Sequence, residues 1–118
     1  MIATHVPDRE SSRWLRSAVA HALAAVAAEP ALRACEHIET LPCVLTIWDQ
    51  RLRCLSCTAE HLRTLRVLDA AEDHTCDRCR DLAETVDTLV IYLGDLHLVV
   101  GLCAACLSLE GVRPHAAR

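Results

Sequence analysis

Cysteine is the residue type whose number and spacing in this chain are best suited to chemistry. The sequence holds 8 cysteines in 118 residues. Most of them fall into pairs with two residues between the members, which are Cys54/Cys57, Cys76/Cys79 and Cys103/Cys106. Such a pair bends the backbone so that both sulfurs face one point, and zinc takes four sulfur or nitrogen ligands in a tetrahedral arrangement. The pattern therefore predicts zinc held by cysteine thiolates.

A predicted β-hairpin lies between the last two pairs and brings them together. Residues 88–93 form a β-branched and aliphatic run, a Gly-Asp turn signal follows, and residues 96–100 form a second run. We therefore expect the two pairs to share one zinc ion. The four predicted ligands are Cys76, Cys79, Cys103 and Cys106.

A short helix is predicted after this hairpin. Residues 103–110 carry cysteines in the first turn, and Gly111 is typical of a helix C-cap. The order of cysteine pair, hairpin and ligand-bearing helix in residues 76–110 resembles that of the treble-clef zinc fingers. That family includes nucleic-acid binders, protein-interaction modules, ribosomal proteins and nucleases. The resemblance therefore implies a fold far more than an activity.

Residues 35–68 show a weaker version of the same order. Residues 43–48 and 51–53 are predicted to be two strands joined by a turn, and the next cysteine pair opens a predicted helix. The apolar positions of that helix are Leu62, Leu65 and Leu68. We therefore expect a second zinc module, N-terminal to the first.

This N-terminal module needs two ligands besides Cys54 and Cys57. Cys35 and His37 are the predicted ones, because an imidazole nitrogen binds zinc as readily as a thiolate sulfur does. Cys43 is an alternative that would replace one of them, and its other interpretation is a small buried apolar side chain. His61, one helical turn after the pair, is a lesser candidate.

Residues 1–34 are predicted to contain an amphipathic helix that starts near Pro7 and Asp8 and ends at Pro30. Its apolar side chains recur at three- and four-residue spacing, at Trp14, Leu15, Val19, Ala22, Leu23 and Val26. We expect this face to cover the zinc modules. The alternative is a homodimer or partner contact through residues 14–26. No apolar run approaches the ~20 residues that a membrane-spanning helix needs.

The predicted architecture is thus a small, metal-stabilised α+β fold with two treble-clef-like zinc modules. The N-terminal helix occupies residues 1–34, and the first zinc module with an acidic linker occupies residues 35–75. The second zinc module occupies residues 76–118. A chain of this length buries little apolar area, so the free energy of binding two zinc ions is expected to be part of its folding free energy.

The charge balance bears on the choice of partner. The formal net charge is −4 and the sequence pI is about 5.9, which disfavours nucleic acid because phosphate backbones bind clustered cations. Nucleic-acid binding remains the alternative, through a rim of arginines with Trp48 placed to stack on a base. The rim consists of Arg51, Arg53, Arg63 and Arg66. All 12 basic residues are arginine, a bias typical of G- and C-rich coding sequences such as those of actinobacteria or their phages.

The cysteine pattern also allows three alternatives to structural zinc sites. The cysteines would form disulfides in a secreted protein, and thiolates also hold iron. A zinc-dependent hydrolase needs an open coordination position, which the first site would offer if one ligand were absent, with Glu36 or Glu39 as the base. Four ligands close a site to substrate. We therefore predict a small, cytoplasmic, non-catalytic zinc-binding protein whose partner is another protein.

Overall fold

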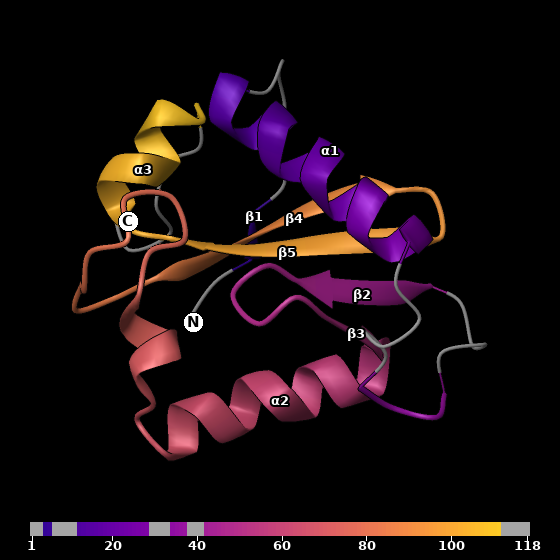
Figure 1. Ribbon diagram of the computed structural model, residues 1–118. Coiled ribbons are helices and arrows are strands. Elements are labelled where there is room, and N and C mark those ends of the chain that lie inside the picture. Colours follow the sequence, from indigo (N-terminus) through magenta and orange to yellow (C-terminus); the bar gives the residue numbers. More distant parts are fainter. Residues whose placement is uncertain (1–3, 6–11, 29–33, 38–41, 112–118) are drawn as a thin grey trace.

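A computed structural model describes residues 4–5, 12–28, 34–37 and 42–111 of the chain (Figure 1). These residues form a small α+β structure with a 5-stranded sheet and helices on both faces. The helices are α1 (Arg13–Ala28), α2 (Leu55–Val67), α3 (Ala104–Leu109) and the 3₁₀ helix η2 (Ala71–His74). In Figure 1, α1 and α3 lie on one side of the sheet and α2 lies on the other.

The five strands form one continuous sheet. They are β1 (Thr4–His5), β2 (Cys43–Thr46), β3 (Arg51–Cys54), β4 (Asp87–Leu93) and β5 (Leu96–Leu102), and their spatial order is β1-β4-β5-β2-β3. Strands β4 and β5 are an antiparallel hairpin, and β2 and β3 are another. Strand β2 runs parallel to β5, which joins the two hairpins. Each zinc module that the sequence predicts therefore contributes its hairpin to a shared sheet.

The strands agree with the sequence prediction except at their ends. Strands β4 and β5 are one or two residues longer than predicted, and Gly94 closes their turn with a φ of +70°, a conformation that glycine adopts without steric cost. Strand β2 ends at Thr46, two residues earlier than predicted, because residues 47–50 form the turn to β3. Strand β1, which pairs in parallel with β4, was not predicted.

Helix α1 packs against the sheet of its own chain. Leu15 and Ala22 are fully buried in the core, and Trp14, Val19 and Val26 are partly buried around them. The predicted apolar face is therefore largely confirmed. Leu23 departs from it, since 46% of its surface is exposed.

The N-terminus of α1 has a capping residue. The Leu15 N–H donates to Ser12 Oγ at 3.1 Å, which satisfies one of the backbone donors that a helix start leaves without an intrahelical partner. The helix begins at Arg13, later than predicted. The residues predicted to bound it, Pro7, Asp8 and Pro30, lie outside the described residues.

Helix α2 covers the β2–β3 side of the opposite face. Leu65 is buried, Leu62 is half-buried, and Leu68 at the C-cap is 70% exposed. The predicted acidic linker turns away from the helix at Asp69, whose φ is +49°, and continues into η2. Among the described residues, no helix combines the length and the apolarity that crossing a membrane requires.

Candidate metal centres

The first candidate metal centre, which we call the C-terminal cluster, contains Cys76, Cys79, Cys103 and Cys106. Their sulfur atoms all lie within 4.8 Å of one another, and the sulfurs of Cys79 and Cys103 are 3.9 Å apart. Zinc–sulfur bonds of about 2.3 Å in a tetrahedron place two sulfurs about 3.8 Å apart. The spacing therefore fits a tetrahedral metal ion.

Two structural elements supply these sulfurs. Cys76 and Cys79 lie on a tight turn in which the Arg80 N–H donates to the Cys76 carbonyl at 2.9 Å and the Cys76 N–H donates to the Asp81 carbonyl at 3.0 Å. Cys103 is the N-cap of α3, and Cys106 lies in that helix. Arg80 has a φ of +67°, in the left-handed region that glycine prefers.

Asp77 holds the turn against the sheet. Its N–H donates to the Gly101 carbonyl at 2.8 Å, and its Oδ2 accepts the Gly101 N–H at 2.7 Å. Burial raises the pKa of Asp77 to about 6. Because Gly101 is two residues before Cys103, this pair of hydrogen bonds fixes the distance between the two halves of the C-terminal cluster.

The backbone stabilises negative charge on one sulfur of this cluster. Burial disfavours the Cys76 thiolate, but three backbone N–H groups outweigh this effect and lower the pKa of Cys76 to about 7. They belong to Cys103, Cys79 and Arg78. Burial and the neighbouring sulfurs raise the pKa of Cys106. The four sulfurs could together hold a divalent metal ion, whose charge would stabilise all four as thiolates.

The second candidate, the N-terminal cluster, contains Cys35, His37, Cys54 and Cys57. Their ligand atoms also lie within 4.8 Å of one another. His37 Nδ1 is 3.5 Å from the Cys57 sulfur and 3.9 Å from the Cys54 sulfur. A tetrahedral zinc ion places nitrogen and sulfur ligands about 3.6 Å apart, so these distances also fit.

The N-terminal cluster is built around the start of α2. Cys54 ends β3 and is the N-cap of α2, and its sulfur accepts the Cys57 N–H at 3.4 Å. The Cys35 sulfur accepts the Cys54 N–H at 3.4 Å, and the preceding Ala34 N–H donates to the Leu52 carbonyl at 2.8 Å. The residues around Cys35 are thus attached to the edge strand, which brings them to the helix start.

The same backbone effect operates in the N-terminal cluster. The Cys57 N–H is the main cause of the lowered pKa of Cys54. The Cys54 sulfur is in turn the main cause of the raised pKa of Cys57, which is about 11. Each cluster has one exposed ligand, His37 or Cys79, and the C-terminal cluster has two buried cysteines where the N-terminal cluster has only Cys54.

The geometry does not fit disulfides. A disulfide needs sulfurs about 2.05 Å apart, and all eight cysteines are free thiols in this structure. Tetrahedral groups of sulfur and nitrogen ligands suit zinc, and sulfur alone also suits iron.

No known family, no curated protein sequence and no solved structure matches this chain. The metal interpretation therefore rests on the ligands and their spacing.

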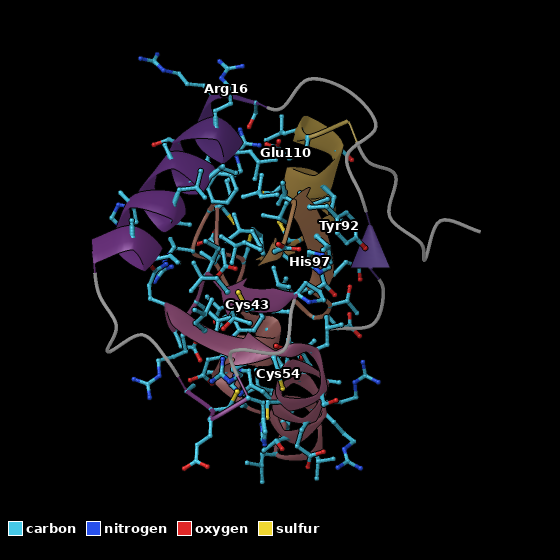
Figure 2. The ribbon with its side chains drawn as sticks, turned by 90° about the vertical axis from the view of Figure 1, so that its right-hand side faces the viewer. Arg16, Cys43, Cys54, Tyr92, His97 and Glu110 are labelled. Atoms are coloured by element: carbon cyan, nitrogen blue, oxygen red, sulfur yellow. The ribbon has the colours of Figure 1, made fainter. Side chains whose placement is uncertain are left out.

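Cys43, the alternative ligand, lies apart from both clusters of the described residues. It faces Leu96 and Cys54 across the sheet, and it packs against the apolar core. Its thiol donates to the Asp95 carbonyl at 3.7 Å. Figure 2 shows Cys43 on the sheet and Cys54 at the start of α2. Cys43 is therefore a half-buried side chain beside the core rather than a fully buried one.

His61, the lesser candidate ligand, and two further histidines make contacts of their own. His61 accepts the Trp48 indole N–H through Nε2 at 3.1 Å and stacks on that ring. His74 lies 2.7 Å from Asp69, and this hydrogen bond is the main cause of its raised pKa. His97 is half-buried and meets the Tyr92 ring edge-on, with ring centroids 4.6 Å apart (Figure 2).

Two arginines of the predicted rim have acidic partners. Arg53 donates to Asp49 at 2.8 Å and to Thr46 Oγ1 at 2.9 Å, and Arg63 forms an ion pair with Glu60. Arg51 is exposed. Of the two glutamates considered as catalytic bases, Glu36 is exposed and Glu39 lies outside the described residues.

Sequence reasoning missed a buried ionic network beside the C-terminal cluster. Glu110 is fully buried and accepts hydrogen bonds from Arg78 Nη1 at 2.7 Å and from the Ser12 N–H at 3.3 Å. The Ser12 hydroxyl donates to the same carboxylate. Arg78 also lies over the Trp14 ring, 5.8 Å from its centroid. Because Arg78 lies between Cys76 and Cys79, this network connects the turn that carries these two cysteines, called the metal-binding turn below, to α1 and α3.

Proposed function

We propose that this chain is a small, non-catalytic zinc-binding protein whose two structural zinc sites support a surface for binding another protein. The observation that carries the proposal is the gathering of eight sulfur and nitrogen ligands into two groups of four. Free energy released on metal binding is then part of the folding free energy. A reducing compartment, the cytoplasm, belongs to the same proposal because metal-bound thiolates persist there.

The treble-clef interpretation is part of this proposal. In the C-terminal half, a cysteine-bearing turn is followed by the β4–β5 hairpin and by α3, whose N-cap and first turn carry the remaining cysteines. The N-terminal half repeats the hairpin and helix as β2, β3 and α2, and Cys35 and His37 take the place of the turn. This order of elements supports two treble-clef-like modules that share one sheet.

The number of ligands supports a structural role for the metal. A catalytic zinc ion keeps one position for water or substrate, whereas structural zinc has four protein ligands. Each cluster offers four. In the N-terminal cluster, both ligands whose absence would open the site, Cys35 and His37, lie with the other two. A hydrolase built on this site is therefore the less supported function.

Contacts of the rim side chains support protein over nucleic acid as the partner. Arg53 and Arg63 are neutralised by Asp49 and Glu60, and phosphate binding would have to displace those carboxylates. Trp48 is stacked on His61 rather than presented to a base. Val67 and Leu68 expose apolar surface at the end of α2, and burial of apolar surface is the main favourable term in most protein–protein association.

Native mass spectrometry of the purified chain tests the metal part of the proposal. We expect a mass increase of two zinc ions over the metal-free chain. Cys57→Ser and Cys79→Ser should each lose one ion, because each removes a ligand from a different cluster. Cys43→Ser is the matched control and should keep both ions. One ion or none in the parent protein, or loss of an ion in the Cys43 variant, would contradict the assignment.

A further inference from the structure

A hollow of about 300 Å³ opens on the face of the molecule that carries α1. Three chain segments line it, namely α1, the β2–β3 turn and the metal-binding turn of the C-terminal cluster. The lining side chains include Trp14, Ala18, His21, Ile47, Gln50 and Asp77. It is separate from both clusters of metal ligands.

Asp77 provides the hollow with an acceptor that the fold leaves available. Its residue surface is 6% exposed, and its Oδ2 accepts the Gly101 N–H. Its other oxygen, Oδ1, accepts no hydrogen bond from the described residues. Asp77 lines the hollow, so Oδ1 is the oxygen that this carboxylate offers to a ligand there. Arg80, the nearby cation, is exposed and donates no hydrogen bond to this carboxylate.

Other groups in the hollow also suit a planar cation. The Gln50 amide N–H donates to the Ile47 carbonyl at 3.0 Å, which leaves the amide oxygen of Gln50 as an acceptor. Trp14 and Ile47 provide apolar walls, and the small side chain of Ala18 leaves space between them. The Trp14 ring already attracts one guanidinium group, that of Arg78. Aromatic faces and carboxylates are the two groups that a guanidinium binds best.

We propose that this hollow binds the guanidinium group of an arginine side chain on a partner protein. The inference rests on the proposed function of protein binding and adds the chemistry of the partner. A lysine ammonium is a compact charge that lacks the planar surface to stack on Trp14 and to bond two acceptors side by side. The net charge of −4 also favours a basic partner, because opposite charges speed association.

Two-dimensional ¹H–¹⁵N NMR of the zinc-loaded full chain tests the inference. The probe is N-acetyl-arginine methylamide, compared with the equivalent lysine and citrulline compounds; citrulline has the same shape as arginine without its charge. We expect saturable shifts of the Trp14 indole N–H and the Gly101 N–H. The arginine probe should bind at least tenfold more tightly than the citrulline probe.

Variants test whether the probe binds in the hollow or only responds to the overall negative charge of the protein. Ala18→Leu fills the space without altering Asp77 and should abolish the saturable shifts, and Asp77→Asn should weaken binding about tenfold or more. Glu84→Gln, which removes an exposed carboxylate, should leave binding unchanged. An arginine probe that does not saturate, or that binds the Ala18→Leu variant as it binds the parent, overturns the inference.

Zinc content measured on the same samples separates this inference from the proposed function. A chain with two zinc ions that does not bind the arginine probe overturns the inference about the hollow and leaves the zinc sites intact. A chain that binds the probe with fewer zinc ions supports the hollow and overturns the two-site proposal. Agmatine, a free guanidinium compound, tests whether the ligand of the hollow is a small molecule rather than an arginine side chain of a protein. Binding of agmatine ten times tighter than the arginine probe would overturn a protein side chain as the ligand.

Discussion

A substitution at Glu110 tests how α1 is held against the rest of the fold. Its carboxylate is fully buried at the end of α3 and accepts hydrogen bonds from Ser12, at the start of α1, and from Arg78 in the metal-binding turn. Figure 2 shows Glu110 between α3 and the start of α1. Replacing Glu110 with alanine leaves the Arg78 guanidinium without its carboxylate and removes the acceptor for Ser12.

The expected loss follows from the full burial of the Glu110 side chain and the partial burial of Arg78. Removing one member of a buried ion pair costs about 3–5 kcal/mol, because the other charge stays buried without compensation. The Arg78 side chain keeps 22% of its surface exposed, so water compensates part of its charge and we expect about 3 kcal/mol. For a domain of this size, that corresponds to a decrease in melting temperature on the order of 10 °C.

Urea unfolding of zinc-loaded protein, followed by circular dichroism, measures this loss. Zinc content is determined for each variant so that metal loss is not mistaken for loss of the ion pair. Glu84→Gln, a change at an exposed carboxylate, should alter the free energy of unfolding by less than about 0.5 kcal/mol. The double variant Glu110→Gln with Arg78→Met should recover part of the loss, because neither charge remains buried. A Glu110→Ala variant within 1 kcal/mol of the parent would refute this reasoning.

Three further predictions follow from individual residues. Arg80→Gly should raise the free energy of unfolding by about 0.5–1 kcal/mol because it relieves a positive φ, whereas Arg66→Gly within α2 should lower it by about 1 kcal/mol; equal effects would contradict this. Burial, and then the charge of Arg53, lower the pKa of His61, so the unfolded chain binds this proton first and stability falls as the pH drops below about 6.5. In a Trp14→Phe variant, Trp48 fluorescence should report the His61 titration with a midpoint below 6.5, and a midpoint above it would reverse the sign. Finally, electrophoretic gel shifts with DNA and RNA should show no binding at physiological salt; a salt-sensitive shift that Arg51→Glu combined with Arg63→Glu abolishes would replace protein binding with nucleic-acid binding.

Local patterns in the sequence account for what could be predicted. Each Cys-x2-Cys pair is a local feature, on a tight turn at Cys76 and at the helix starts at Cys54 and Cys103. The segment from Thr88 to Val100 contains two apolar and β-branched runs around a Gly-Asp turn, so its hairpin depends on neighbours in sequence. The apolar spacing in α1 and α2 similarly reflects helical periodicity. Structures that form between adjacent residues leave a periodic or motif signal, and these elements all do.

Long-range contacts leave no such signal. The parallel pairing of β2 with β5 joins residues more than 50 positions apart, such as Cys43 and Leu96, and a parallel pair has no turn that marks it in the sequence. Strand β1 has two residues, too few for a periodic pattern. The ion pair of Arg78 with Glu110 spans 32 positions. Its one local hint is an arginine placed between two ligand cysteines.

The sequence alone leaves open which residues complete the N-terminal cluster. Cys35, His37 and Cys43 all lie upstream of Cys54 at spacings that permit a zinc site, and the residue types alone do not decide among them. In the structure, Cys43 packs against the core and is not among the ligand atoms of either cluster. Cys35 and His37 instead lie beside β3 near the start of α2.

X-ray absorption spectroscopy at the zinc edge tests the central claim of two closed sulfur- and nitrogen-ligated sites most directly. The two clusters contain seven cysteines and one histidine, so 7/2 and 1/2 give an average of 3.5 sulfur and 0.5 nitrogen ligands per zinc ion. We expect sulfur at about 2.3 Å and nitrogen at about 2.0 Å, with no oxygen ligand. An oxygen ligand, or an average of three sulfurs or fewer per zinc ion, would contradict the account.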